Sequence, residues 1–176
     1  MSSKSSSKSS RTRQGYLFEK EIERSLGLWG WRYWFKIPDA RTMKGFKLPS
    51  APQVPADFCG IDENKKFCLL ECKQVSKPSL PYDRVKEHQV ENLFLANNSG
   101  GIGYLCVNFN NRLRGHRRID RTFLLNSRRW DEYKLSHPER KSMPIAAFEL
   151  LGEELYLIRR GGKRYWLRRF KNGKQT

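Results

Sequence analysis

The hydrophobic and polar positions of the chain alternate between helical and extended patterns. From about Gln14, apolar side chains recur at steps of three or four residues, with charged side chains on the other faces; these apolar positions are Phe18, Ile22, Leu26 and Trp29. The spacing predicts an amphipathic helix. Gly27 and Gly30 favour its end, because glycine is a poor helix former.

Extended segments follow this helix. Residues 31–37 are aromatic and β-prone and stop at Pro38, which predicts a first strand. Residues 39–55 contain three prolines and little periodicity, so a loop is expected there. Residues 56–61 and 67–73 are short apolar segments on either side of the polar residues 62–66, a pattern typical of two paired strands.

The second half of the chain continues the alternation. We expect a helix over residues 82–97, whose apolar side consists of Val85, Val90, Leu93, Phe94 and Leu95. Strands are predicted over 103–109 and 121–125, and a short helix over 127–134. Two β-prone segments within 155–170 flank a Gly-Gly pair, which indicates a C-terminal hairpin. The order of elements predicts an α/β fold, one domain over residues 14–176 with a mixed central β-sheet flanked by helices.

The charge of the chain is large and unevenly distributed. Lys and Arg number 35 against 18 acidic residues, a formal net charge of +17. Residues 1–56 carry 11 basic and 4 acidic side chains, residues 57–111 carry 6 and 7, and residues 112–176 carry 18 and 7. The whole positive excess therefore lies outside the central third. Basic flanks indicate a polyanionic partner, and an acidic centre suits a divalent cation held beside a phosphate.

Composition excludes several classes of protein. Hydrophobic residues make up 38% of the chain and aromatic residues 12%, enough for a core, so full-length disorder is excluded. No apolar run approaches the roughly 18 residues that span a bilayer. The first thirteen residues lack the apolar segment of a signal peptide, so a cytoplasmic protein with no membrane partner is expected. Cys68 and Cys72 lack a second Cys or His pair to complete a zinc site, so buried reduced thiols are expected.

Two basic segments are candidates for nucleic-acid contact. Residues 1–13 are almost all Ser, Lys, Arg and Thr, and we expect a disordered arm that either contacts DNA phosphates through Arg11 and Arg13 or only solubilises the chain. Residues 112–118 form either a DNA-binding loop or a solvated turn. The density of positive charge favours DNA contact, through Arg112, Arg114, Arg117 and Arg118.

Asp57 and Glu71 are the sharpest candidates for chemistry. In the predicted strand pair, Asp57 begins one strand and Glu71 ends its partner, so the carboxylates can meet at one end of the sheet. Strand alternation puts Glu71 and Lys73 on one face and turns Cys72 to the other. Carboxylates bind Mg²⁺ or Mn²⁺ through oxygen, and a lysine can stabilise charge on phosphate, so the set suits metal-assisted phosphodiester hydrolysis. The alternative is a structural ion pair worth under about 1 kcal/mol.

Seven short segments, in order, resemble those of the PD-(D/E)xK nuclease superfamily, and the wider pattern is similar to RecU-type Holliday junction resolvases. The resemblance runs from about residue 15 to residue 143. It rests on the segments Gly15–Glu19, Lys36–Pro38, Ala56–Gly60, Leu70–Lys73, His88–Val90, Gly100–Tyr104 and Arg140–Met143. The resemblance implies a restriction-endonuclease-like core, to which the hairpin over 155–170 is an unmatched addition.

The resemblance also implies roles for particular residues. Asp57 and Glu71 would be metal ligands, Lys73 would stabilise the transition state, Gln89 would complete the metal or water shell, and Glu19 would lie near the site. Family members usually carry a threonine two residues before the aspartate. Here that position is Pro55, which can offer only its carbonyl oxygen.

Further nucleic-acid contacts are suggested by position. The stalk of the family, which enters the junction centre, would correspond to residues 39–55; this segment is short here but carries Arg41, Lys44 and Lys47. His88, beside the matched Gln89, is interpreted as a phosphate contact or a packing residue, with a proton shuttle as the alternative.

The function implied by the resemblance is a structure-selective endodeoxyribonuclease. It would use Mg²⁺ or Mn²⁺, act as a homodimer on four-way DNA junctions, and leave 5′-phosphates at paired symmetric nicks. Two alternatives stay open: a sequence-specific nicking or restriction-type nuclease of the same fold, and a basic nucleic-acid-binding protein with structural carboxylates.

Overall fold

A mixed β-sheet forms the centre of the protein. The computed structural model describes residues 5–38, 53–111 and 119–169. Within these ranges, seven strands follow the order β1-β2-β3-β5-β6-β8-β9, and β4 (Ser79–Pro81) pairs with β7 (Ser142–Pro144) in a separate two-stranded sheet. Among these described strands, only β3 and β5 pair in parallel. The predicted mixed sheet is therefore confirmed.

The N-terminal half contributes a helix and three antiparallel strands. Helix α1 (Ser5–Leu26) runs into the short 3-10 helix η1 (Gly27–Trp29) and is followed by β1 (Tyr33–Lys36). Strands β2 (Phe58–Ile61) and β3 (Phe67–Val75) pair across the turn that the polar residues 62–66 predicted. Helix α2 (Glu87–Asn98) then leads into β5 (Ile102–Asn111), which lies parallel to β3. The patterning of the sequence predicted this order of helix, three strands, helix and strand.

The C-terminal half extends the sheet on the β5 side. Strand β6 (Ile119–Asn126) is antiparallel to β5 and is followed directly by α3 (Ser127–Ser136). After β7 comes α4 (Ile145–Leu151), and then the hairpin of β8 (Glu153–Arg160) and β9 (Lys163–Leu167). The hairpin predicted from the Gly-Gly pair is confirmed. It joins the sheet through β8, which pairs with β6.

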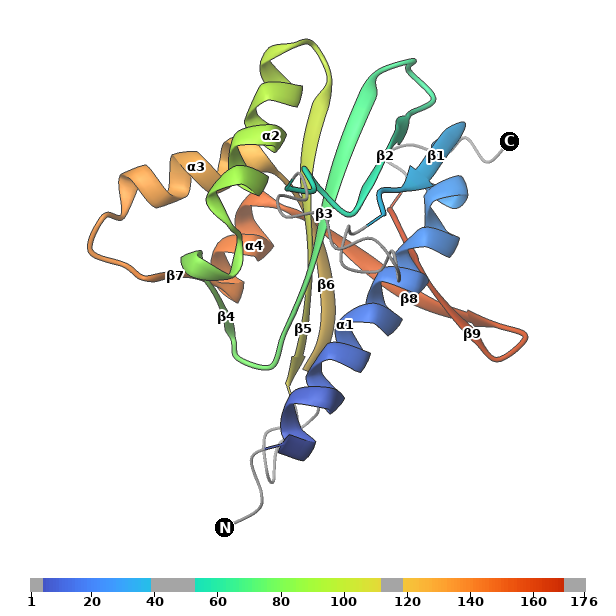
Figure 1. Ribbon diagram of the computed structural model, residues 1–176, viewed down its shortest axis with the longest axis horizontal. Coiled ribbons are helices and arrows are strands. Elements are labelled where there is room, and N and C mark those ends of the chain that lie inside the picture. Colours follow the sequence, from blue (N-terminus) through green and yellow to red (C-terminus); the bar gives the residue numbers. More distant parts are fainter. Residues whose placement is uncertain (1–4, 39–52, 112–118, 170–176) are drawn as a thin grey trace.

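Helices cover both faces of the sheet, so the core has two parts (Figure 1). On one face, side chains of α2, α3 and α4 pack against β3, β5 and β6, with Leu93, Trp130 and Phe148 fully buried. On the other face lie α1 and η1, and Trp166 of β9 packs into the same cluster. Their buried side chains include the apolar positions that predicted the first helix, which are Phe18, Ile22, Leu26 and Trp29. Strand alternation divides β3 between the two parts, and Cys72 belongs to the α1 side.

Strand β9 is attached to α1 by hydrogen bonds around Trp166, which is 1% exposed. The indole N–H of Trp29 donates to the carbonyl oxygen of Trp166 at 2.5 Å, and the backbone N–H of Trp166 donates to Oγ of Ser25 at 2.9 Å. The indole N–H of Trp166 donates to Oε2 of Glu21 at 2.9 Å. The hairpin is therefore held rigidly against the helix.

Some expected boundaries differ from the observed ones. Helix α1 begins at Ser5 and not at Gln14, so residues 5–13, expected in the disordered arm, are helical in the structure. The sequence before Gly15 contains neither proline nor glycine, and a helix already nucleated downstream extends at little cost. The short elements β4, β7 and α4 were not predicted, because segments of three to seven residues carry little periodicity.

The second helix was predicted to begin too early. Residues Tyr82–Arg84 form a 3-10 helix, and α2 begins only at Glu87 because Lys86 has extended backbone angles. The side chain of Gln89 accepts a hydrogen bond from the backbone N–H of Lys86, which caps the helix at this point. Phe94 and Leu95, expected on its buried side, are 46% and 59% exposed.

Two smaller expectations concern the cysteines and membranes. All four cysteines are free and buried, as predicted. Within the described ranges, no helix has the length and apolar character needed to cross a membrane.

Candidate active site

Asp57 lies beside the strand that carries Glu71. It immediately precedes β2, and its backbone N–H donates to the carbonyl oxygen of Leu70 at 3.1 Å. Its Oδ2 accepts a hydrogen bond from the backbone N–H of Cys72 at 2.7 Å. Because Leu70 and Cys72 flank Glu71, these two bonds fix Asp57 beside Glu71. The two carboxylates therefore lie at the same place in the sheet, as their spacing predicted.

Glu71, Lys73 and Gln89 form one hydrogen-bonded group. Glu71 is 1% exposed, and its Oε1 accepts hydrogen bonds from Nζ of Lys73 and, at 2.7 Å, from the side-chain amide of Gln89. Lys73 also donates to Oε1 of Gln89 at 3.2 Å. Gln89 comes from the first turn of α2, so the cap of this helix also fixes the amide against β3. The structure thus brings together four of the five residues named for the site.

Glu19, the fifth residue, approaches from α1. Its Oε2 accepts a hydrogen bond at 2.6 Å from Nζ of Lys36, the last residue of β1. The charge of Glu19 raises the pKa of both Asp57 and Glu71, so it lies within electrostatic reach of the pair. Lys36 is a site neighbour that was not singled out from the sequence as a functional residue, although its segment contributed to the resemblance.

Burial and neighbouring negative charges disfavour the ionised forms of Asp57 and Glu71. Burial, followed by the charges of Glu71 and Glu19, raises the pKa of Asp57 from 3.8 to about 8, against the N–H of Cys72 and the charge of Lys73, which lower it. Burial also raises the pKa of Glu71, although Lys73 and Gln89 oppose this shift. Without a further cation, the pair therefore favours holding a proton.

The donor atoms suit a hard divalent cation. Within the described part of the chain, Oε2 of Glu71 is buried without a hydrogen-bond partner, so one carboxylate oxygen is left for another ligand. The described residues contain no group of three or more His, Cys, Asp or Glu side chains placed to hold a metal. Two carboxylates still fit Mg²⁺, because this ion commonly takes one or two carboxylates and completes its shell with water and substrate phosphate.

Most of the residues predicted to contact nucleic acid lie outside the part of the chain that the structure describes. Arg41, Lys44 and Lys47 lie outside the described residues, as do Arg112, Arg114, Arg117 and Arg118. Arg11 falls within α1, although its side chain is not among those described, and Arg13 is exposed on the same helix. His88 is half-buried on α2, next to Gln89. These assignments stay predictions.

A comparison with known protein families covers the residues of this site. The model of the RecU family, described as Recombination protein U, matches residues 49–163, which include Asp57, Glu71, Lys73 and Gln89. A solved structure that resembles this one is Hjc, a Holliday junction resolvase of the archaeal hyperthermophile Archaeoglobus fulgidus. It is 16% identical with a TM-score of 0.46, over 78% of this chain and 93% of that chain. A search of curated proteins finds no match.

Proposed function

Because the chain belongs to the RecU family of recombination proteins, we propose that it is an endodeoxyribonuclease that resolves four-way DNA junctions. The observation that carries the proposal is the meeting of Asp57, Glu71, Lys73 and Gln89 at one place, within the residues that the family model matches. The family match confirms the resemblance drawn from the sequence motifs. The junction as substrate, the paired symmetric nicks and the 5′-phosphate products are the finer part of the proposal.

Asp57 and Glu71 are proposed to hold Mg²⁺ or Mn²⁺. Their raised pKa values and the unpartnered Oε2 of Glu71 support this role, because a bound cation would favour both ionised carboxylates. When bound, the ion would polarise the scissile phosphate and lower the pKa of a coordinated water. Cys72 supports the arrangement only through its backbone N–H, which fixes Asp57.

Lys73 is proposed to stabilise the negative charge that develops on the phosphate. Its ammonium group is held in place by Glu71 and Gln89, so little reorganisation is needed when the substrate arrives. Gln89 orients both partners and is proposed to complete the metal or water shell. Glu19, held by Lys36, would add negative charge on the α1 side of the site.

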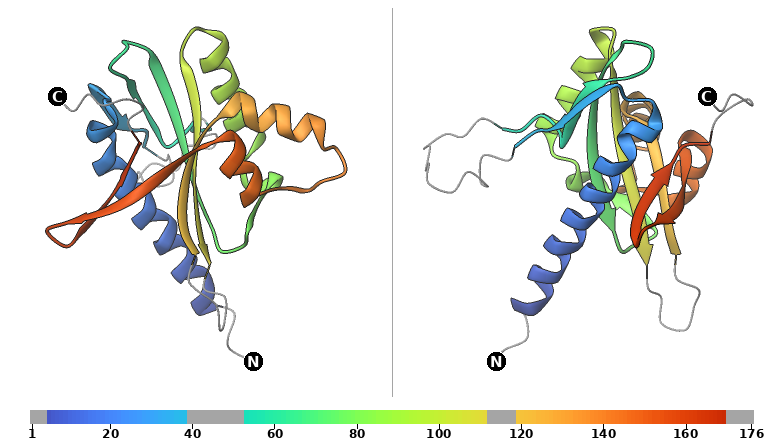
Figure 2. Two further views of the ribbon diagram at one scale, coloured as in Figure 1. Left: turned by 180° about the vertical axis from the view of Figure 1, so that it is seen from behind. Right: turned by 90° about the vertical axis from the view of Figure 1, so that its right-hand side faces the viewer.

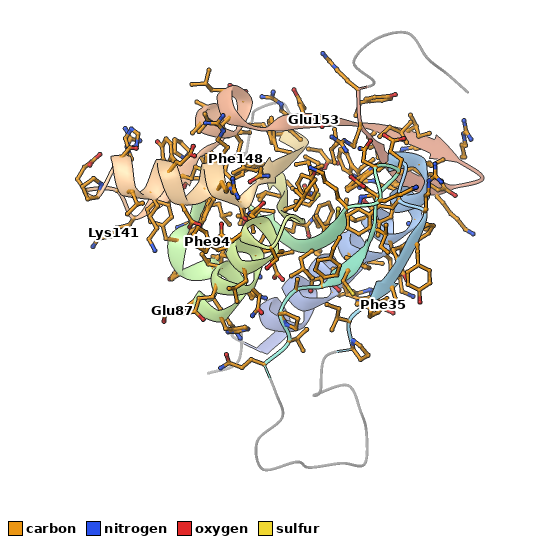
Figure 3. All side chains as sticks on the ribbon, turned by 90° about the horizontal axis from the view of Figure 1, so that it is seen from above. Phe35, Glu87, Phe94, Lys141, Phe148 and Glu153 are labelled. Carbon is orange, nitrogen blue, oxygen red and sulfur yellow. The ribbon has the colours of Figure 1, made fainter. Side chains whose placement is uncertain are left out.

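A homodimer would suit the proposed substrate. Two equivalent sites related by a two-fold axis match the two symmetric nicks that resolve a junction. An apolar strip at the β1 edge of the sheet supports this state: Tyr33, Phe35, Ile61 and Phe67 lie on one face and are 62%, 49%, 42% and 48% exposed. Figure 3 shows Phe35 at this edge, on the opposite side of the molecule from Lys141. We propose the strip as a contact between two copies.

Cleavage of a labelled synthetic four-way junction and of a linear duplex with the same arms tests the function. The wild type, Asp57→Asn and the control Asp83→Asn, at an exposed position outside the site, are compared in Mg²⁺, in Mn²⁺ and in EDTA. We expect paired nicks in the junction only, dependent on metal, lost in Asp57→Asn and kept in Asp83→Asn.

The other outcomes select the alternatives. Cutting of the linear duplex at a fixed sequence would indicate a nicking or restriction-type nuclease. Tight binding of the junction without cleavage in either metal would overturn the catalytic proposal and leave a nucleic-acid-binding protein.

A further inference from the structure

The tip of the β8–β9 hairpin carries an unusual arrangement of charge. Arg159 lies directly opposite Arg164, and Arg160 lies directly opposite Lys163. Cβ atoms of such cross-strand partners are about 5 Å apart, and like charges in these positions destabilise a hairpin. Residues 155–169 contain six basic side chains and no acidic one. We call Arg159, Arg160, Lys163 and Arg164 the basic tip.

Intramolecular partners neutralise only one member of the basic tip. Arg164 pairs with Asp120 at 2.9 Å and lies 3.4 Å from Glu21. Arg159, Arg160 and Lys163 are exposed and make no ion pair with any of the residues that the structure describes. Three positive charges are therefore presented to solvent on a short segment.

The basic tip is both rigid and free of packing. Gly161 and Gly162 have φ angles of 53° and 71°, the conformation of a tight two-residue hairpin turn. A Cβ atom at either glycine would meet nothing within 4 Å. Figures 1 and 2 show the hairpin extending past α1, away from the rest of the chain. Since its base is fixed to α1 through Trp166, the tip projects as a rigid arm.

We propose that the basic tip binds the sugar-phosphate backbone of a DNA arm, entering the groove as a two-stranded ribbon. The major groove of B-DNA is wide enough for such a ribbon. Strand alternation places Arg160 and Lys163 on one face of the ribbon and Arg159 on the other, so cations point toward both walls of the groove. Phosphates on the two strands would then offset the repulsion between the opposed cations.

This proposal rests on the proposed function as a DNA endonuclease and deepens it. The helix α1 connects the tip to the site, because it carries Glu19 near Asp57 and also holds β9 through Glu21 and Ser25. An arm gripped by the tip would thus be fixed in relation to the scissile phosphate. Helix α1 lies outside the residues that the family model matches, whereas Arg159, Arg160 and Lys163 lie at the C-terminal end of the matched range.

The test is the salt dependence of DNA binding, measured by fluorescence anisotropy in EDTA over a range of salt concentrations, about 50 to 250 mM. The double variant Arg160→Thr/Lys163→Thr is compared with the control Lys65→Asn/Lys66→Ser, which removes two exposed positive charges from the β2–β3 turn. Asn suits position 65 because its φ angle is 62°. Both a four-way junction and a linear duplex serve as probes.

We expect the tip variant to lower the slope of log K against log salt by about 2, at about 0.9 for each lost phosphate contact. Affinity near about 0.15 M salt should then fall about 10- to 30-fold, and the control should keep the wild-type slope. Hydroxyl-radical footprinting should show lost protection on one arm. Thermal unfolding should show no loss of stability, because the variant removes a like-charge pair.

An unchanged slope in the tip variant would overturn the proposal, as would equal losses in the tip and control variants. A footprint that is the same for the tip variant and the wild type would also overturn the proposal. If the wild type then bound an acidic protein more tightly than DNA, the tip would have a different partner. Failure of the proposed function is distinguishable from these results. A wild type that neither prefers nor cuts the junction refutes the resolvase, whereas the slope on linear duplex still tests the tip.

Discussion

Replacing Asp57 with asparagine is expected to stabilise the metal-free protein. The substitution keeps the shape of the side chain and an oxygen that accepts the N–H of Cys72, but it removes the charge. In the folded protein the pKa of Asp57 is about 8, against 3.8 ordinarily, chiefly because of burial and the neighbouring carboxylates. Folding near neutral pH therefore requires the carboxyl group to take up a proton, which lowers the stability of the wild type.

The sign and size of the effect follow from the linkage between proton binding and folding. Below pH 3.8 the group is protonated in both states and contributes nothing. Between pH 3.8 and 8 the folded state binds one proton more than the unfolded state, so stability falls by about 1.4 kcal/mol per pH unit. Taken from pH 3.8 to pH 7, this slope amounts to about 4 kcal/mol. Since Glu71 shares the titration, we expect Asp57→Asn to recover about 1 to 3 kcal/mol.

Calorimetry in EDTA at pH 5, 6 and 7 measures this effect. For a chain of this length, the expected gain corresponds to a rise in Tm of about 3 to 8 °C at pH 7, shrinking toward pH 5. The exposed control Asp83→Asn should change stability by less than about 0.5 kcal/mol at every pH. Millimolar Mg²⁺ should raise the Tm of the wild type and leave that of Asp57→Asn almost unchanged. A lower Tm for Asp57→Asn, or a gain independent of pH, would refute the reasoning.

Three further predictions address other parts of the structure. Lys73→Met should lower the single-turnover rate of junction cleavage by at least about 100-fold. The Kd for DNA, measured by anisotropy, should stay within a few-fold of the wild type. Comparable losses in rate and affinity would assign Lys73 to DNA binding instead. Trp166→Phe, which removes the indole N–H that Glu21 accepts, should lower the free energy of unfolding by about 1 to 3 kcal/mol in urea titrations, and an unchanged midpoint would contradict the anchoring of β9. Phe35→Glu should shift the chain toward monomer in sedimentation experiments, whereas the exposed α4 control Leu150→Glu should not; identical behaviour would exclude the apolar strip as the contact.

The sequence predicted those parts of the fold whose pattern is local and long. The spacing of Phe18, Ile22 and Leu26 predicted α1 and its buried side, and the Gly-Gly pair predicted the hairpin. Boundaries failed where tertiary contacts decide them. The start of α2 depends on the bond between Gln89 and the backbone of Lys86, a contact that periodicity does not reveal.

The candidate site was predictable to a similar degree. The predicted pairing of two strands placed Asp57 next to Glu71, and strand alternation placed Lys73 on the same face as Glu71; the structure contains both contacts. The approach of Gln89 and Glu19 was implied only by the resemblance, because both come from helices whose packing on the sheet has no local signal. The contact between Glu19 and Lys36 joins a helix to a strand edge and became visible only in three dimensions.

The distribution of charge explains why such a basic chain keeps an acidic centre. When ionised, Asp57, Glu71 and Glu19 repel one another and also a DNA phosphate, which opposes substrate binding at the site itself. A divalent cation removes both repulsions at once, whereas exposed cations away from the site bind phosphates without any metal. Binding of DNA by this protein should therefore depend on salt and cleavage on metal. The two properties should be separable by substitutions at the basic tip and at the carboxylates.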